Sequence, residues 1–111
     1  MRACHVQPNR AEMALLALLQ HSFPDDWAYT GNGSIILGGK CPDFVNINGK
    51  KALIELYGDW WHRGHSEADR AACFAPFGYQ TLVVWEHELK DPGAVVQKIM
   101  STFYVEKILA G

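Results

Sequence analysis

Asp43-Phe-Val-Asn-Ile-Asn-Gly-Lys-Lys-Ala-Leu-Ile-Glu-Leu-Tyr57 is the stretch that decides the fold class of this sequence. It contains two strand-like runs, 43–47 and 51–57, joined through Asn48-Gly49. That dipeptide is preferred in tight β-hairpins, because both of its residues adopt positive φ at little cost. The pattern therefore predicts an antiparallel pair of strands at the centre of the fold.

The segments around this hairpin alternate between helical and extended patterns. Asn9 is a suitable N-cap for a first helix over 9–21, whose apolar stripe includes Leu15 and Leu19. Asp91-Pro92 is a typical cap and first residue of a last helix that continues to about Ile108. The other predicted elements are short strands at 27–30 and 34–37, a helix at 66–76 and an apolar strand at 79–85. A hairpin followed by a helical crossover predicts an α/β fold, with a mixed β-sheet flanked by helices.

Length and composition restrict the class of protein further. The chain has 111 residues, of which 49% are hydrophobic and 20% charged, so we expect one folded domain over 1–111. No apolar run reaches the roughly 18 residues of a membrane span, and the start lacks the layout of a secretory signal. Three cysteines without a C-x-x-C pair argue against a disulfide scaffold. These features favour a cytoplasmic protein without a membrane partner.

The formal net charge of −2 excludes a broad basic surface as the means of binding a polyanion. If the protein acts on nucleic acid, it must do so locally, through a bound cation, or beside another DNA-binding segment.

Two acidic residues of the hairpin are candidates for a metal site. Asp43 opens one strand directly after Pro42, and Glu55 lies within the apolar run of the other. A carboxylate inside an apolar strand is costly unless it is paired or binds a metal. Carboxylates on adjacent strands could converge on Mg²⁺, which prefers oxygen ligands. The alternative is that Asp43 forms a turn and Glu55 faces water.

The segment 58–65 contains two tryptophans, two histidines and an arginine, which is an unusual concentration of side chains that can bind DNA or transfer protons. A histidine such as His62 can take a proton from water, Arg63 can meet a phosphate, and an exposed Trp60 or Trp61 can stack on bases. The tryptophans could equally complete the core.

Two further interpretations concern metal binding and helix capping. A second kind of metal site would combine His62, His65 and Asp69 as zinc ligands of a hydrolase. Asn9-x-x-Glu12 matches a capping box and Ser66-x-x-Asp69 approximates one, which would give Glu12 and Asp69 a structural role.

Three segments in this order resemble the very short patch repair (Vsr) endonucleases, and more closely the Vsr-like catalytic domains of certain homing endonucleases. They are Cys41-Pro-Asp-Phe-Val45, Leu53-Ile-Glu-Leu-Tyr-Gly-Asp-Trp-Trp-His62 and Gly78-Tyr-Gln-Thr-Leu-Val-Val-Trp-Glu-His-Glu-Leu89. The helix that carries Glu12 resembles the first helix of the family, and the likeness spans roughly residues 8–89.

The resemblance implies a restriction-endonuclease-like core of the PD-(D/E)xK superfamily and a role for each matching residue. Asp43 would be the central metal ligand, with Glu55 near the second acidic position. His62 would be the general base and Asp69 its orienting partner, while Glu12 would help to hold the waters of the metal. Trp60 and Trp61 would contact DNA, and Arg63 is our further candidate for DNA binding.

The implied function is a Mg²⁺- or Mn²⁺-dependent DNA endonuclease acting on double-stranded DNA. We expect a separate DNA-recognition domain, and a homodimer could supply paired nicks. Asp59 stands where the repair enzymes have a zinc-binding cysteine, so we expect no structural zinc. The alternatives are a non-catalytic DNA-binding or assembly domain and the zinc hydrolase described above.

Overall fold

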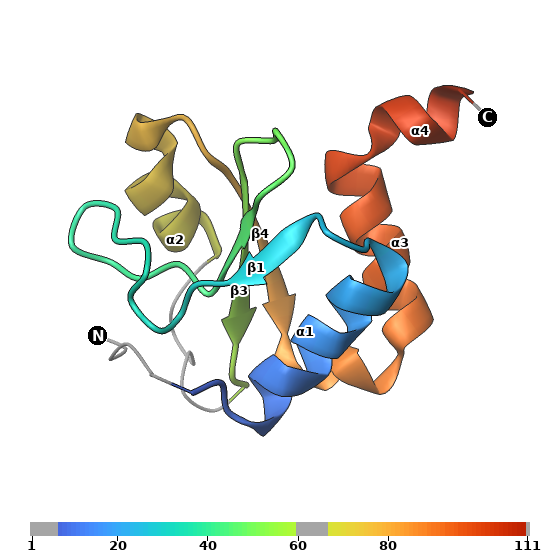
Figure 1. Cartoon of the computed structure of the whole chain (residues 1–111), viewed down its shortest axis with the longest axis horizontal. Coiled ribbons are helices and arrows are strands. Elements are labelled where there is room, and N and C mark those ends of the chain that lie inside the picture. The colour runs from blue at the N-terminus through green and yellow to red at the C-terminus, as the bar shows by residue number, and fades with distance from the viewer. Residues whose placement is uncertain (1–6, 60–66, 111) are drawn as a thin grey trace.

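A four-stranded mixed sheet lies at the centre of the computed structural model, which describes residues 7–59 and 67–110 (Figure 1). Its strands lie side by side in chain order: β1 (Trp27–Tyr29), β2 (Phe44–Asn46), β3 (Ala52–Tyr57) and β4 (Gln80–Trp85). β2 is antiparallel to both of its neighbours, β1 and β3, and β3 and β4 are parallel. The predicted α/β class with a mixed sheet is confirmed.

The central hairpin forms as predicted, but its connection is longer than two residues. Phe44 pairs with Ile54, and the chain between the strands spans 47–51. Gly49 has φ of +94°, a conformation that costs glycine little. The Asn46 side chain accepts hydrogen bonds from the backbone N–H groups of Asn48 and Lys50, which holds the wider loop closed.

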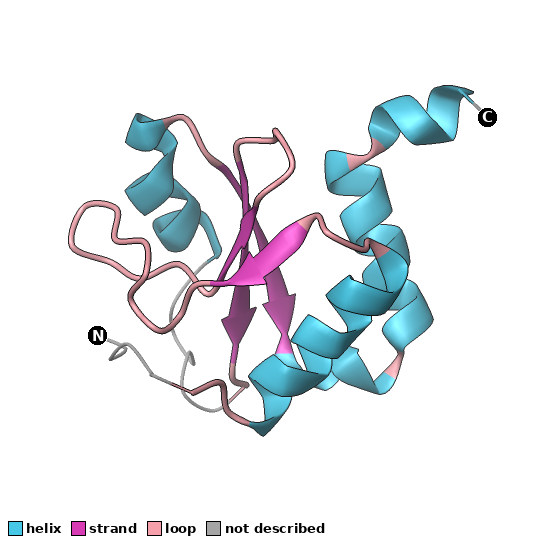
Figure 2. Ribbon diagram, viewed as in Figure 1, coloured by secondary structure: helices cyan, strands magenta, loops and turns pink. Residues whose placement is uncertain are grey.

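The two faces of the sheet are covered by different helices (Figure 2). One face packs on α1 (Arg10–Ser22) and α3 (Pro92–Phe103), and the other lies against α2 (Glu67–Phe74). Because side chains alternate along a strand, Ala52, Ile54 and Leu56 enter the main core beside α1 and α3. The intervening positions of β3, including Leu53 and Glu55, therefore face α2.

The ends of the helices follow the predicted capping residues, with one correction. Asn9 and Glu12 form the predicted capping box of α1, and Asp91 caps α3. The last helix does not continue unbroken to Ile108, because Tyr104 leaves the helical conformation and α4 (Val105–Ala110) begins after it. The Tyr104 ring is buried, and its hydroxyl contacts Trp27 and Asp26. These contacts outweigh one more turn of helix.

The predicted strand at 34–37 is wrong. Ile35 and Leu37 pack against the smaller apolar cluster under α2. Gly38 and Gly39 then adopt φ of +59° and +79°, so the chain reverses at once and Leu37 bridges only to Lys40. Alternating apolar residues here supply packing without a strand partner.

The predicted helix at 66–76 is shorter than expected. It ends as α2 at Phe74 and is followed by the 3₁₀ turn η1 (Ala75–Phe77); a second 3₁₀ turn, η2 (Glu86–Lys90), follows β4. Cys41 is disulfide-bonded, and Cys73 is free. In the described part of the chain, every helix is too short or too polar to cross a membrane.

Candidate active site

Asp43 and Glu55 lie directly opposite each other across β2 and β3. Both side chains are almost fully buried, with 3% and 1% of their surfaces exposed. The Asp43 backbone N–H donates to Oε2 of Glu55 at 2.7 Å, and Oδ2 of Asp43 accepts from the Leu56 N–H at 2.8 Å. The hairpin register therefore brings together the two carboxylates that the sequence selected as metal ligands.

A third charged side chain, Arg70, completes this arrangement from α2. Its Nε donates to Oε1 of Glu55 at 2.5 Å, and its guanidinium lies 5.5 Å from the centre of the Phe74 ring. Buried charges are tolerated only when they are paired, and Arg70 provides the pairing for Glu55. Sequence analysis missed Arg70. Arg70 lies four residues before Phe74, so both side chains lie on the same face of α2. Because Phe74 is apolar and expected in the core, this spacing would have placed Arg70 on the side of α2 that faces the sheet.

Burial and Asp43 shift the pKa of Glu55 in one direction, and Arg70 shifts it in the other. Loss of water around the carboxylate, followed by repulsion from Asp43, raises the pKa of Glu55 to about 7. The charge and the hydrogen bond of Arg70 act against this increase. A cation that approached both carboxylates would relieve the repulsion between them.

Beyond Glu55, the same face of the sheet becomes aromatic and then charged. Tyr57 packs edge-on against Trp85 with ring centres 5.0 Å apart, and Trp85 Nε1 donates to Glu67 at the start of α2. Desolvation raises the pKa of Tyr57 to about 12, so its hydroxyl stays protonated at neutral pH. This aromatic pair separates the buried carboxylates from the exposed ends of the strands.

An exposed His–Asp pair lies where β3 and β4 end. Nδ1 of His87 is 2.6 Å from Oδ1 of Asp59, and the His87 ring stacks on Trp85. Sequence analysis missed this pair too. Tyr57 and Trp85 are register partners on parallel strands, so the residues two positions beyond each of them meet.

Glu12 is fully buried at the start of α1, and its carboxylate accepts from the Asn9 N–H at 2.9 Å. This confirms its capping role, and its role toward metal-bound water stays a prediction. Asp69 is exposed in the first turn of α2. The two partners expected for it, Ser66 as helix cap and His62 as general base, lie outside the described residues. Trp60, Trp61, Arg63 and His65 also lie outside them.

The donor atoms of the carboxylate pair fit a hard divalent cation in kind. Within 7–59 and 67–110, no group of three or more His, Cys, Asp or Glu side chains is arranged to hold a metal ion. Asp43 and Glu55 supply two oxygen-bearing side chains, the type that Mg²⁺ prefers. Both oxygens of Glu55 already accept hydrogen bonds, so a cation would have to share them or displace a donor.

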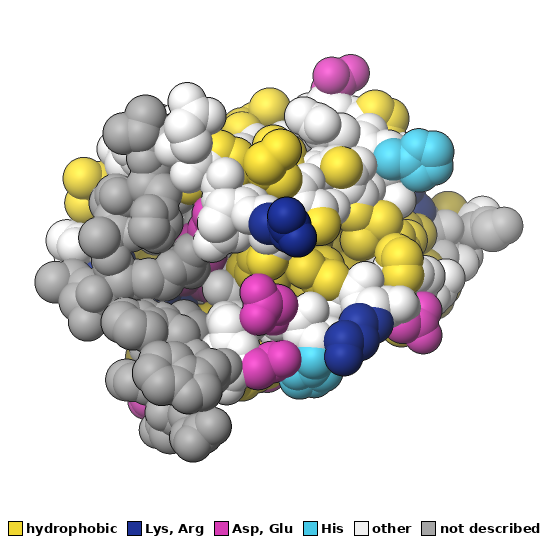
Figure 3. Space-filling view, turned by 90° about the horizontal axis from the view of Figure 1, so that it is seen from below, with side chains coloured by type: hydrophobic (Ala, Val, Ile, Leu, Met, Phe, Trp, Pro, Cys, Tyr) yellow, Lys and Arg dark blue, Asp and Glu magenta, His cyan; other side chains and the backbone are white. Residues whose placement is uncertain are grey.

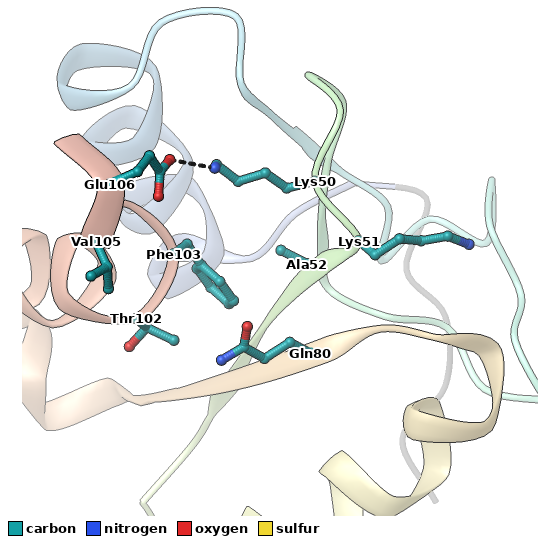
Figure 4. A pocket seen from close by; sticks show the side chains of 8 residues that line it. All are labelled: Lys50, Lys51, Ala52, Gln80, Thr102, Phe103, Val105 and Glu106. Atoms are coloured by element: carbon teal, nitrogen blue, oxygen red, sulfur yellow. Dashed lines mark hydrogen bonds and ion pairs between the residues drawn. The ribbon is translucent and has the colours of Figure 1, made fainter.

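The residues that the structure describes form no broad basic patch on the surface around the strand ends. Figure 3 views this end of the molecule, and Lys and Arg side chains are scattered there among acidic and apolar ones. A hollow of about 380 Å³ lies at the opposite end of β3 and β4, beside the ion pair of Lys50 and Glu106 (Figure 4). It contains neither Asp43 nor Glu55, so we do not assign the chemistry to it.

No protein-family model matches this chain, and no curated protein matches it. Among solved structures, the catalytic domain of the homing endonuclease I-Bth0305I is similar in fold, with a TM-score of 0.64 and 20% sequence identity. The alignment covers 88% of this chain and 97% of that domain. The chain therefore shares the α/β fold of a homing endonuclease catalytic domain.

Proposed function

We propose that this protein is a metal-dependent DNA endonuclease with a Vsr-like, restriction-endonuclease-like core of the PD-(D/E)xK type. The observation that carries the proposal is the buried pair of Asp43 and Glu55, in contact across a hairpin. The likeness in fold to a homing endonuclease catalytic domain supports the proposal, because the alignment covers 88% of this chain and 97% of that domain.

In this proposal Asp43 and Glu55 would hold Mg²⁺ or Mn²⁺. A bound divalent ion would act as a Lewis acid that neutralises charge on the scissile phosphate. The backbone contacts of the two carboxylates fix their positions before DNA arrives, which keeps the ligands preorganised. The acidic pair would repel DNA without a cation, so DNA binding and metal loading should be coupled.

The remaining assignments rest on the resemblance in sequence. His62 would take the proton of the attacking water, Asp69 would orient that histidine, and Glu12 would help to hold the waters of the metal. Trp60, Trp61 and Arg63 contact double-stranded DNA. No structural zinc belongs to this proposal.

The wider setting is also part of the proposal. We expect residues 1–111 to form one catalytic domain in a cytoplasmic protein, served by a separate DNA-recognition domain. A homodimer would make paired nicks. The scattered basic side chains in Figure 3 agree with recognition by another segment.

A plasmid-nicking assay with Mg²⁺ tests the function. Asp43→Asn keeps the size of the side chain but removes a charged ligand, and we expect nicking to fall by about a hundredfold or more, since a metal contributes several kcal/mol to such a reaction. His62→Ala should also lose activity. Asp91→Asn is the matched control, because it changes an acid to an amide at the cap of α3 and asparagine also caps well.

The outcomes separate the candidate functions. Equal nicking by wild type, Asp43→Asn and His62→Ala would contradict this site. DNA binding without nicking by folded wild-type protein would favour a non-catalytic DNA-binding or assembly domain. One zinc per chain in protein purified without added zinc would favour a hydrolase that uses His62, His65 and Asp69.

A further inference from the structure

Arg70 occupies the position at Glu55 that a cation would take. Its Nε contacts Oε1 of Glu55, while Oε2 is held by the backbone of Asp43. Of the two Glu55 carboxylate oxygens, Oε1 is therefore the one that contacts a positively charged side chain. A metal ion that binds Glu55 through this oxygen must compete with the guanidinium.

The geometry of the contact favours exchange. Stable arginine–carboxylate pairs commonly use two parallel N–H···O bonds, whereas Arg70 reaches Glu55 through Nε alone. Among the described residues, the Arg70 side chain donates a hydrogen bond to Glu55. A guanidinium has five N–H donors, so most of its donors are not used in this contact.

The charges also allow an exchange. With both acids ionised, Asp43, Glu55 and Arg70 together carry one negative charge, so the guanidinium only partly balances the pair. A divalent ion would balance both carboxylates. The Arg70 side chain is 15% exposed, so part of it reaches the surface.

We propose that Arg70 is an internal competitor for the divalent cation at Glu55, and that it is a positioning residue which leaves Glu55 when the site is loaded. This inference rests on the proposed function. It assigns to one residue of α2 the control of metal affinity, and a guanidinium released from Glu55 could pair with a phosphate. DNA and metal would then be bound cooperatively.

The test is a titration of the full chain with Mn²⁺, in which free Mn²⁺ is followed by electron paramagnetic resonance. We expect Arg70→Gln to bind Mn²⁺ about tenfold more tightly or better than wild type, because removing one adjacent positive charge from a buried site changes an equilibrium by a decade or more. Arg70→Lys should fall between the two. The effect should disappear in a Glu55→Gln background.

Lys98→Gln is the matched control. Lys98 also pairs with a part-buried acid, Glu88 at 2.9 Å, but it belongs to α3 and does not contact the carboxylate pair. Its Mn²⁺ affinity should equal that of wild type. A general loss of ion pairs would affect this variant as well, so the control isolates the position of Arg70.

The possible results distinguish this inference from the proposed function. Unchanged or weaker Mn²⁺ binding by folded Arg70→Gln, with binding by wild type intact, would overturn the inference and leave the metal site standing. If Arg70→Gln does not fold, Mn²⁺ binding by Arg70→Lys that is equal to or weaker than that of wild type overturns it. Absence of Mn²⁺ binding in wild type and in every variant would remove the metal site, and the inference with it.

Discussion

Replacing Tyr104 by phenylalanine tests how the C-terminal helices are fixed to the sheet. The Tyr104 hydroxyl accepts from Nε1 of Trp27 at 3.0 Å and donates to Oδ2 of Asp26 at 2.7 Å. Burial, reinforced by the hydrogen bond to Asp26, raises the pKa of Tyr104, so the hydroxyl remains a donor at neutral pH. Phenylalanine retains the ring that stacks on Phe23 at 4.7 Å, so the substitution removes only the polar contacts.

The expected loss of stability follows from those two bonds. Trp27 is 5% exposed, so its indole N–H would lose its partner without regaining water. Leaving such a donor unsatisfied costs about 1–3 kcal/mol, and the lost bond to a carboxylate adds about 1 kcal/mol after Asp26 is hydrated. We therefore expect Tyr104→Phe to lower the free energy of unfolding by about 2–4 kcal/mol.

Urea denaturation followed by circular dichroism measures this loss. Tyr79→Phe is the matched control: within 7–59 and 67–110 the Tyr79 hydroxyl has no hydrogen-bond partner, and Lys51 lies over its ring at 4.4 Å. We expect this control to stay within about 0.5 kcal/mol of wild type, as most substitutions away from specific contacts do. A loss below about 1 kcal/mol for Tyr104→Phe, or equal losses for both variants, would refute the reasoning.

Two further substitutions test a cap and an ion pair. Asn9→Ala should lower the free energy of unfolding by about 1 kcal/mol, because it removes the oxygen that accepts from the Glu12 N–H at 2.8 Å, whereas Asn9→Ser should stay close to wild type in the same urea assay. Similar losses in both variants would contradict the capping argument. For Glu88, burial opposes ionisation, but the Trp85 N–H and Lys98 outweigh it and lower the pKa. A lowered pKa stabilises the fold above the ordinary value of 4.5, and this contribution is lost as the pH falls through the pKa of the folded state. Wild type should therefore exceed Glu88→Gln by about 1 kcal/mol at neutral pH, and thermal unfolding in acid should show the gap closing. A gap that does not change with pH would contradict this assignment.

The sequence predicted those elements whose signals are local. The cap at Asn9 and the hairpin around Gly49 depend on neighbouring residues, and both are present. The apolar pattern of 34–37 matched a strand, but a strand also needs a partner, which no local pattern reveals. The break at Tyr104 likewise depends on contacts with Trp27, 77 positions away in the sequence.

The candidate site shows the same division. The contact between Asp43 and Glu55 was predictable, because a hairpin fixes which residues lie opposite each other. Arg70 reaches Glu55 only after the chain has crossed from β3 to α2, and nothing near Glu55 in the sequence identifies that partner. The roles of Glu12 and Asp69 toward a metal or a histidine stay predictions, as do those of the segment 60–66.

The order of the strands also bears on how the chain folds. β1, β2, β3 and β4 are neighbours in the order of synthesis, and the hairpin of β2 and β3 closes the shortest of the three connections, 47–51. A β-hairpin forms in about 1–10 μs, so the turn around Gly49 can close well before α2 docks. During that interval the two acids would already be adjacent and still hydrated. Docking of α2 would then both dehydrate them and deliver the guanidinium, which makes the last step of assembly sensitive to ionic strength.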